Sequence, residues 1–318
     1  MKNKAFLFVS GVLLSALVLE GGARTLSPLL GPPLVSWNPM EDAKKLKIEE
    51  FLKKYQSPEF IFMGNSTTLI GLNPSIFDAS AGLPIGSSFN AGMNGSDIKT
   101  MRDFALGYVV DKAKPKNLVL LFSNERMIQD NGYQKLRVES PGLLSNSYFF
   151  RYRNTLKDPM TLNTVFRVFK YRDTRQGIVY RWADNLDDYG YSTYKITDTK
   201  FPEAGWDPAM EVRNDEKSYL IDVSQLKNLI EIRDYTRNKG VNLIIGTVPL
   251  LAQDTAYRGT IRDIANRLKI SFVQGNDVFG QGKYFQDVVH VNKQGSRIFS
   301  EYLAQILPNI VPDPAQNN

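Results

Sequence analysis

The chain has no cysteine and only one histidine, His290, among its 318 residues. Without cysteine it cannot form disulfide bonds, thiolate nucleophiles or thiolate metal ligands. A single imidazole argues against a histidine-rich zinc or iron centre. No cluster of acidic residues in the sequence predicts an all-carboxylate magnesium site. We therefore expect a protein that works without a metal ion or other cofactor.

Dense clusters of positive charge are also missing, although the formal net charge is +6. Lysine and arginine are spread along the chain, which argues against a nucleic-acid partner. The small positive excess favours an anionic partner or surface. The 42% hydrophobic and 23% charged residues are ordinary for a globular protein. The length allows one large domain or two small ones.

The first 24 residues differ in composition from the rest of the chain. Lys2 and Lys4 precede "AFLFVSGVLLSALVL", an uncharged apolar run over Ala5–Leu19, and "EGGAR" follows it. This order is typical of a secretory signal peptide or a signal anchor. The run is short for a bilayer span of about 20 residues. Of the two, we favour an uncleaved anchor, with the bulk of the protein outside the cytoplasm, on the periplasmic or cell-surface side.

Strands and helices alternate along the remaining sequence. A proline-rich linker is predicted over Ser27–Pro39 and a helix over Glu41–Tyr55, so that residues 25–57 connect the N-terminal segment to the main domain. Buried strands are predicted in "PEFIFMG", "SSFNAG", "KNLVLLFS", "VNLIIGTVP" and "ISFVQ". Helices are predicted in "DIKTMRDFALGYVVDKA", "VSQLKNLIEIRDYTRNKG" and "TIRDIANRLK", and after His290. The second of these should start after a Ser224 cap and stop at Gly240.

This alternation predicts an α/β fold, a three-layer sandwich with a central, mostly parallel five-stranded sheet over residues 58–318. The alternation breaks over about residues 127–221, a stretch rich in tyrosine, phenylalanine, tryptophan and arginine. We interpret that stretch as an insertion packed over the strand ends as a cap. Its aromatic side chains could stack on sugar rings or fatty chains, but we favour the simpler view that they form the insertion's own core.

Polar residues follow three of the predicted strands. They are Ser66 in "GNSTTLIG", Gly92 and Gly95 in "FNAGMNGSD", and Asn124 in "FSNER". Parallel sheets gather their functional groups at the carboxyl ends of the strands. The glycines would allow a close approach of the backbone at this edge.

A serine hydroxyl becomes a useful nucleophile when a neighbouring base takes its proton. His290 is the only imidazole available, and Asp287, three residues before it, could orient that ring. Fixed donors for a tetrahedral oxyanion would be the backbone amides of Ser66 and Gly95 and the side-chain amide of Asn124.

The nucleophile, the glycine, the asparagine and a D-x-x-H segment, in this order, resemble the SGNH/GDSL hydrolase superfamily. The resemblance covers most of Phe60–Leu307, with the insertion unmatched. "GNS" stands where the family has G-D-S, and "NAGMNGSD" is similar to its second block. "FSNE" departs from the family's G-x-N-D, with Asn124 at the position of its asparagine. "DVVHVNKQGSRIFSEYLA" is similar to the closing block.

The resemblance implies that Ser66 is the nucleophile, that Asp287 and His290 complete the triad, and that Gly95 is an oxyanion donor. The chain has no G-x-S-x-G elbow, which argues against an α/β-hydrolase.

The resemblance implies a membrane-tethered, extracytoplasmic serine esterase or O-acyltransferase. Its substrates would be acyl esters, acetyl esters in particular, of cell-surface carbohydrate. Two alternatives remain. One is a lipase or thioesterase that acts on membrane-derived acyl chains. The other is a non-catalytic binding or assembly protein that keeps the fold, an alternative that the departures at "GNS" and "FSNE" motivate.

Overall fold

The chain forms two compact units in the computed structural model. The structure describes residues 2–30, 39–123, 127–128, 175–192, 196–198, 220–251, 255–275, 282–287 and 289–310. One unit comprises Met1–Leu46 with Tyr133–Asp184, and the other comprises Lys47–Gly132 with Asn185–Asn318. The second unit holds the whole β-sheet and is the one that matters for the predicted site.

Helix α1 occupies the N-terminal segment, from Lys2 to Leu30. Within the described residues, no helix combines the length and the apolar character that crossing a bilayer requires. The predicted membrane anchor therefore finds no support in the described helices. The helix also continues through Ser27–Leu30, where a linker was predicted, because leucines dominate its last turns and favour helix despite Pro28.

Helices α2 (Pro39–Lys54) and α9 (Arg175–Asp184) meet within the first unit. Val179 and Ala183 of α9 form a small apolar cluster with Ala43 of α2. Helix α2 confirms the helix predicted over Glu41–Tyr55.

The sheet of the second unit has five strands in the order β2-β1-β3-β4-β5, and every neighbouring pair is parallel. The strands are β1 (Phe60–Gly64), β2 (Ser88–Asn90), β3 (Asn117–Phe122), β4 (Asn242–Thr247) and β5 (Ser271–Val273). Phe62, Val119 and Ile244 lie side by side across the three central strands. The predicted α/β fold with a five-stranded sheet is confirmed, and the sheet is wholly parallel.

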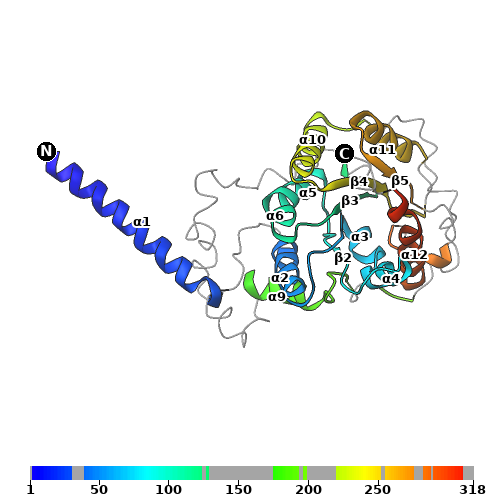
Figure 1. The fold of residues 1–318 in the computed structure, drawn as a ribbon, viewed down its shortest axis with the longest axis horizontal. Coiled ribbons are helices and arrows are strands. Elements are labelled where there is room, and N and C mark those ends of the chain that lie inside the picture. Colours follow the sequence, from blue (N-terminus) through cyan, green and yellow to red (C-terminus); the bar gives the residue numbers. More distant parts are fainter. Residues whose placement is uncertain are drawn as a thin grey trace. The chain divides into compact units, whose positions relative to one another are not determined.

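Helices cover both faces of this sheet (Figure 1). One face carries α3 (Ser66–Gly71), α4 (Pro74–Ser80) and α12 (Lys293–Ile310); the other carries α5 (Ile98–Phe104), α10 (Val223–Asn238) and α11 (Thr255–Leu268). Leu121 and Ile244 join the α3–α4–α12 core. Their chain neighbours Phe122 and Ile245 point to the opposite face, because side chains alternate along a strand.

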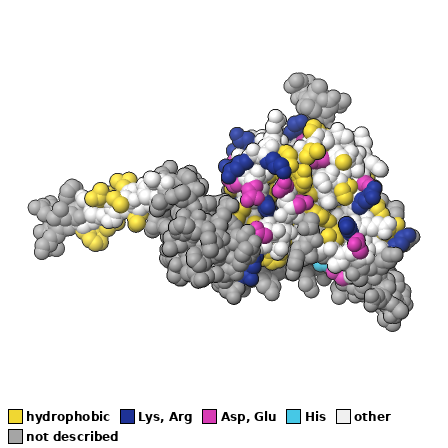
Figure 2. Space-filling view, turned by 90° about the horizontal axis from the view of Figure 1, so that it is seen from below, with side chains coloured by type: hydrophobic (Ala, Val, Ile, Leu, Met, Phe, Trp, Pro, Cys, Tyr) yellow, Lys and Arg dark blue, Asp and Glu magenta, His cyan; other side chains and the backbone are white. Residues whose placement is uncertain are grey.

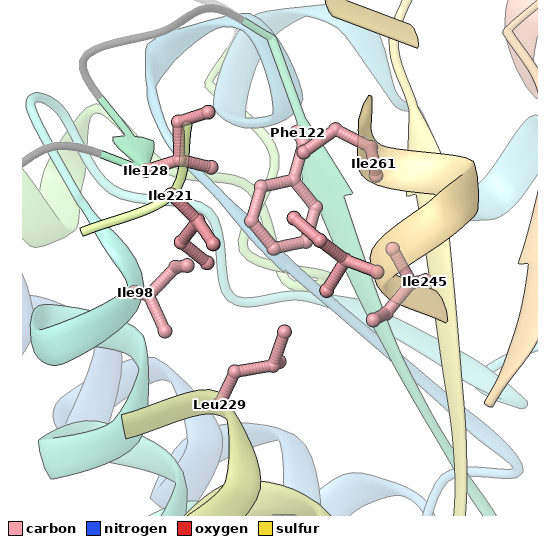
Figure 3. A pocket seen from close by; sticks show the side chains of 8 residues that line it. Ile98, Phe122, Ile128, Ile221, Leu229, Ile245 and Ile261 are labelled. Carbon is pink, nitrogen blue, oxygen red and sulfur yellow. The ribbon is translucent and has the colours of Figure 1, made fainter. Parts of the chain in front are cut away.

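Seven side chains on this opposite face point toward one another in Figure 3. Together with Ile264 they line an apolar gap that has no room for a water molecule. Burial on both faces explains why the strands are continuous apolar runs in the sequence.

Two helix predictions need correction. The helix predicted over 97–113 consists of α5, a π-helical turn at Ala105–Val109, and α6 (Val110–Ala113). Helix α10 starts at Val223 and its N-cap is Asp222, so Ser224 lies inside the helix and is not its cap. The Asp222 N–H donates to the carbonyl of Ile128 at 3.0 Å, which fixes where the chain enters this helix. Gly240 follows the helix with a positive φ of 68°, as predicted.

The same hydrogen bond brings together the two ends of the predicted insertion, because Ile128 and Asp222 flank it. Most of its aromatic segments lie outside the described residues. One described part, residues 185–192, belongs to the sheet unit and bonds to its strand β2 and to the end of the β1–α3 segment. The Tyr189 carbonyl accepts from Asn90 N–H at 2.8 Å, and Ser192 N–H donates to the Leu69 carbonyl at 3.2 Å.

Candidate active site

Ser66 is the first residue of α3, directly after the carboxyl end of β1. Asn65 caps this helix, because its Oδ1 accepts from the N–H of Thr67 at 3.0 Å and from its hydroxyl at 2.7 Å. The backbone N–H of a first helical residue is not used by the helix itself. Gly64 has no substitute here, because a Cβ would lie 2.7 Å from the Leu121 carbonyl oxygen. The local sequence thus places the hydroxyl and the amide of Ser66 at the sheet edge.

His290 lies between Ser66 and Asp287. Its Nε2 is 2.8 Å from Ser66 Oγ, and its Nδ1 is 2.8 Å from Asp287 Oδ2 and 3.1 Å from Oδ1. The carboxylate on Nδ1 favours the tautomer that leaves Nε2 free to accept the serine proton. The structure therefore brings together the three predicted triad residues, although 224 positions separate the serine from the histidine.

The turn from Asp287 to His290 is fixed by its own carboxylate. Asp287 Oδ1 accepts from the backbone N–H of Val289 at 2.9 Å and of His290 at 2.7 Å. Partial burial acts to raise the pKa of the Asp287 carboxyl, but the hydrogen bonds from the His290 ring and from these two amides outweigh it. The pKa therefore lies below its usual value. The aspartate stays ionised beside the imidazole.

The site is partly open to solvent. The side chains of His290 and Asp287 are 20% and 46% exposed. Figure 2 shows the only histidine as a small cyan area, with basic and acidic side chains interspersed over the described surface on that face. The imidazole can thus be reached by a small reactant.

The closing segment packs behind the turn. Phe285 and Val291 pair across it as an antiparallel bridge, and Phe285 is fully buried. Asn292 caps α12 by accepting from Gly295 N–H at 3.0 Å and donates to the Lys283 carbonyl at 2.8 Å. Gly295 is required because a Cβ would lie 2.9 Å from the Val291 Cβ. These contacts explain the spacing of the D-x-x-H block in physical terms.

The predicted oxyanion donors are only partly described. Gly95 lies in an exposed turn after β2 with a φ of 68°, and Met93 N–H ties this loop to the Gly64 carbonyl at 3.0 Å. A Cβ at Gly92 would lie 2.7 Å from the Leu69 amide nitrogen, so Gly92 is the glycine that allows close approach. Asn124 lies outside the described residues. Within those residues no hydrogen bond joins Gly95 to Ser66, and the roles of Gly95 and Asn124 stay predictions.

Two contacts at the site were not predicted from the sequence. Asn65 Nδ2 donates to the buried Ser123 hydroxyl at 2.5 Å. Gln286 Oε1 accepts from the N–H and the hydroxyl of Thr197 at 2.8 and 3.1 Å. The cap position of Asn65 was a usable signal, but nothing in the sequence pairs Ser123 or Thr197 with its partner.

A groove of about 710 Å³ lies beside the closing segment. Its lining residues include polar ones, Asn73, Asp198, Lys293, Gln294, Ser296 and Arg297, and the less polar Ile76, Tyr191 and Ile196. It adjoins the site through Thr197, which lies between two lining residues and binds Gln286, the neighbour of Asp287. In the described part of the chain, no group of three acidic or histidine side chains is placed to hold a metal ion.

No protein-family model matches this chain, and no curated protein matches it. Among solved structures, it is similar to a GDSL-like lipase from Bacteroides thetaiotaomicron VPI-5482, with 11% sequence identity and a TM-score of 0.42 over 86% of this chain and 100% of that one. It is also similar to a protein assigned as an acylhydrolase from Bacteroides fragilis NCTC 9343, with 11% identity and a TM-score of 0.38 over 82% of this chain and 94% of that one.

The order of the parallel strands, with Ser66 after β1 and the Asp287–His290 turn before α12, agrees with the arrangement that the resemblance to SGNH/GDSL hydrolases implies.

Proposed function

We propose that this protein is a serine ester hydrolase or O-acyltransferase that works through an acyl-enzyme on Ser66. The observation that carries the proposal is the continuous hydrogen-bonded chain from Asp287 through His290 to Ser66, with distances of 2.8 Å on both sides of the imidazole. A hydroxyl held in this way can lose its proton as it attacks a carbonyl carbon.

In the first half-reaction, Ser66 Oγ forms a bond to the ester carbonyl carbon while its proton moves to His290 Nε2. The negative charge on Asp287 stabilises the imidazolium that results. The tetrahedral oxyanion would lie near the free N–H of Ser66 at the start of α3. Collapse of this intermediate breaks the ester C–O bond, and the departing alkoxide takes the proton from His290 Nε2.

In the second half-reaction, a hydroxyl compound attacks the acyl-enzyme and gives its proton to His290 Nε2. That proton returns to Ser66 Oγ as the serine leaves. Water as the attacking compound completes hydrolysis, and a sugar hydroxyl completes acyl transfer. The 20% exposure of the His290 side chain leaves room for either acceptor.

For the substrate we propose an acyl ester of a carbohydrate, with acetyl as the acyl group. The groove next to the site supports this choice, because its lining offers amide, carboxylate, hydroxyl and cationic side chains. Such groups hydrogen-bond to hydroxylated ligands.

We also propose that the protein acts outside the cytoplasm, on the strength of Lys2, Lys4 and the apolar run that follows them. Fractionation of cells that express the full chain or a variant without residues 1–24 tests this. Only the full chain should appear outside the cytoplasm, and equal distribution of both would overturn the proposal.

The enzymatic proposal is tested with aryl esters of increasing acyl length. We expect turnover of the acetate, little turnover of the octanoate, and a loss of about 10³-fold or more in Ser66→Ala. Ser80→Ala, at an exposed serine of α4, is the matched control and should keep full activity. Equal turnover in wild type and Ser66→Ala would remove Ser66 from the reaction. A preference for octanoate would favour the lipase alternative.

A further inference from the structure

Thr197 binds both ends of the segment that carries the triad acid and base. Its N–H and its hydroxyl donate to Gln286 Oε1 at 2.8 and 3.1 Å, and its carbonyl accepts from Lys293 N–H at 3.0 Å. Gln286 directly precedes Asp287, and Lys293 is the first residue of α12, three positions after His290. One residue from the insertion thus closes a staple across the D-x-x-H turn.

The staple adds to the packing of Phe285 and Val291 in the core, because the hydrogen bonds within the turn fix its shape and not its place. The bonds from Asp287 to the amides of Val289 and His290 lie within the turn. The bond from Gln286 N–H to the His290 carbonyl at 2.9 Å is also local. These contacts would survive a rigid shift of the whole turn away from Ser66.

The contacts of Thr197 reach outside the turn. Another described part of the insertion, residues 185–192, also reaches the site, since its Ser192 N–H donates to the Leu69 carbonyl of α3. Helix α3 is the element that begins with Ser66. The Tyr191 hydroxyl in the same segment lies 3.1 Å from the Ser296 hydroxyl of α12. The segment therefore contacts the helix that presents the nucleophile and the helix that follows the base.

We propose that Thr197 and Gln286 are positioning residues, which hold the His290 imidazole at hydrogen-bond distance from Ser66. The inference rests on the proposed function, since it assigns to these residues the placement of the catalytic base. Neither residue touches the reacting atoms. Because misplacement of a catalytic group by about 1 Å can lower the rate about 10²-fold, the effect should appear in kcat.

Gln286→Met is the direct test, because methionine has a similar length but no comparable acceptor for Thr197. Gln286→Glu is the conservative rescue, since a carboxylate can still accept both hydrogen bonds. Thr197→Val removes only the hydroxyl donor and should have a smaller effect than Gln286→Met. Gln305→Met, at an exposed glutamine farther along α12, is the matched control.

His290 provides a readout that does not depend on activity. As the only histidine, it gives the only imidazole N–H signal in the NMR spectrum of untagged, ¹⁵N-histidine-labelled protein. We expect Gln286→Met to broaden this signal or speed its exchange with solvent, and to lower kcat for an aryl acetate about 10- to 100-fold with little change in KM. Gln286→Glu and Gln305→Met should keep the wild-type signal and rate.

A wild-type imidazole signal and exchange rate in Gln286→Met would overturn the inference. Loss of the signal in Gln305→Met as well would also overturn it, because the effect would not be specific to the staple. If the wild-type protein turned over no ester, the proposed function would fail, while the NMR comparison would still decide whether Gln286 positions the ring.

Discussion

Asn65 Nδ2 and Ser123 Oγ form a buried hydrogen bond of 2.5 Å that joins the end of β1 to the end of β3. The Oδ1 atom of the same amide caps α3 through Thr67. One side chain, 6% exposed, therefore fixes the helix that begins with Ser66 and ties it to the neighbouring strand. This double use needs a donor and an acceptor, which an amide has and an ionised carboxylate lacks.

Asn65→Ala should destabilise the protein more than the loss of a helix cap alone. Loss of a cap costs about 1 kcal/mol of unfolding free energy. The Ser123 hydroxyl would keep only its weak contact with the Met127 sulfur, which adds about 1 kcal/mol. Asn73→Ala is the matched control, because Asn73 caps α4 through Ser75 and Ile76. Equal loss of unfolding free energy in both variants, measured by urea denaturation, would show that the contact with Ser123 contributes nothing.

Asp287→Asn should lower kcat by about 10²-fold or more, because an amide does not stabilise an imidazolium and can select the wrong tautomer. The pKa of Asp287 is lowered in the folded state, so its carboxylate contributes stability above the ordinary value of about 4. That contribution is lost as the pH falls through the lowered pKa. The difference in unfolding free energy between wild type and Asp287→Asn should therefore shrink below about pH 4. If the difference in unfolding free energy between wild type and Asp287→Asn grew as the pH fell below about 4, the lowered pKa of Asp287 would be contradicted.

Gly92→Ala should mainly lower the stability of the protein, whereas Gly95→Ala should mainly lower kcat. A Cβ at Gly92 would collide with the Leu69 amide, so we expect a loss of about 1–3 kcal/mol in unfolding free energy. Gly95 has open space around it but a φ of 68°, which costs about 1 kcal/mol for alanine. Gly82, also in open space with a φ of 67°, is the matched control.

If Gly95 is an oxyanion donor, Gly95→Ala should lower kcat more than Gly82→Ala does at the same loss of stability. Equal kcat values in these two variants would remove Gly95 from the oxyanion hole.

Asp78 offers a stability test away from the site. It is 2% exposed, and burial raises the pKa of its carboxyl although Oδ2 accepts from the N–H groups of Ser87 and Ser88. A raised pKa means that the folded state binds the proton more tightly, so stability should fall as the pH rises from the ordinary value through the folded one. Asp78→Asn should lack this fall, whereas Asp78→Ala should cost about 1–3 kcal/mol at any pH because it removes the buried acceptor that the Ser87 and Ser88 amides share.

Denaturation at pH 4 and pH 8 separates these outcomes for Asp78. The same pH dependence of the unfolding free energy in wild type and Asp78→Asn would contradict the raised pKa of Asp78.

The sheet could be predicted because its strands are buried on both faces and appear as apolar runs between turn residues. Ser66, Asp287 and His290 could be predicted because the sequence itself shows their residue types, their order along the chain and the short spacing between Asp287 and His290. The staple could not: Thr197 and Gln286 are polar, separated by 89 positions, and join through side chains that have no periodicity. The Asn65–Ser123 contact likewise depends on the register of two parallel strands.

The errors have local causes. Ser224 matches the composition of a helix cap, but a backbone contact between Asp222 and Ile128 places the helix start earlier. The membrane anchor at the N-terminus stays a prediction.

The central claim is that His290 activates Ser66, and labelling with a fluorophosphonate followed by mass spectrometry tests it most directly. We predict a single adduct, located on Ser66, that is absent in Ser66→Ala, forms much more slowly in His290→Gln and is unchanged in Ser80→Ala. An unlabelled wild-type protein, or an adduct that persists in Ser66→Ala, would contradict the account.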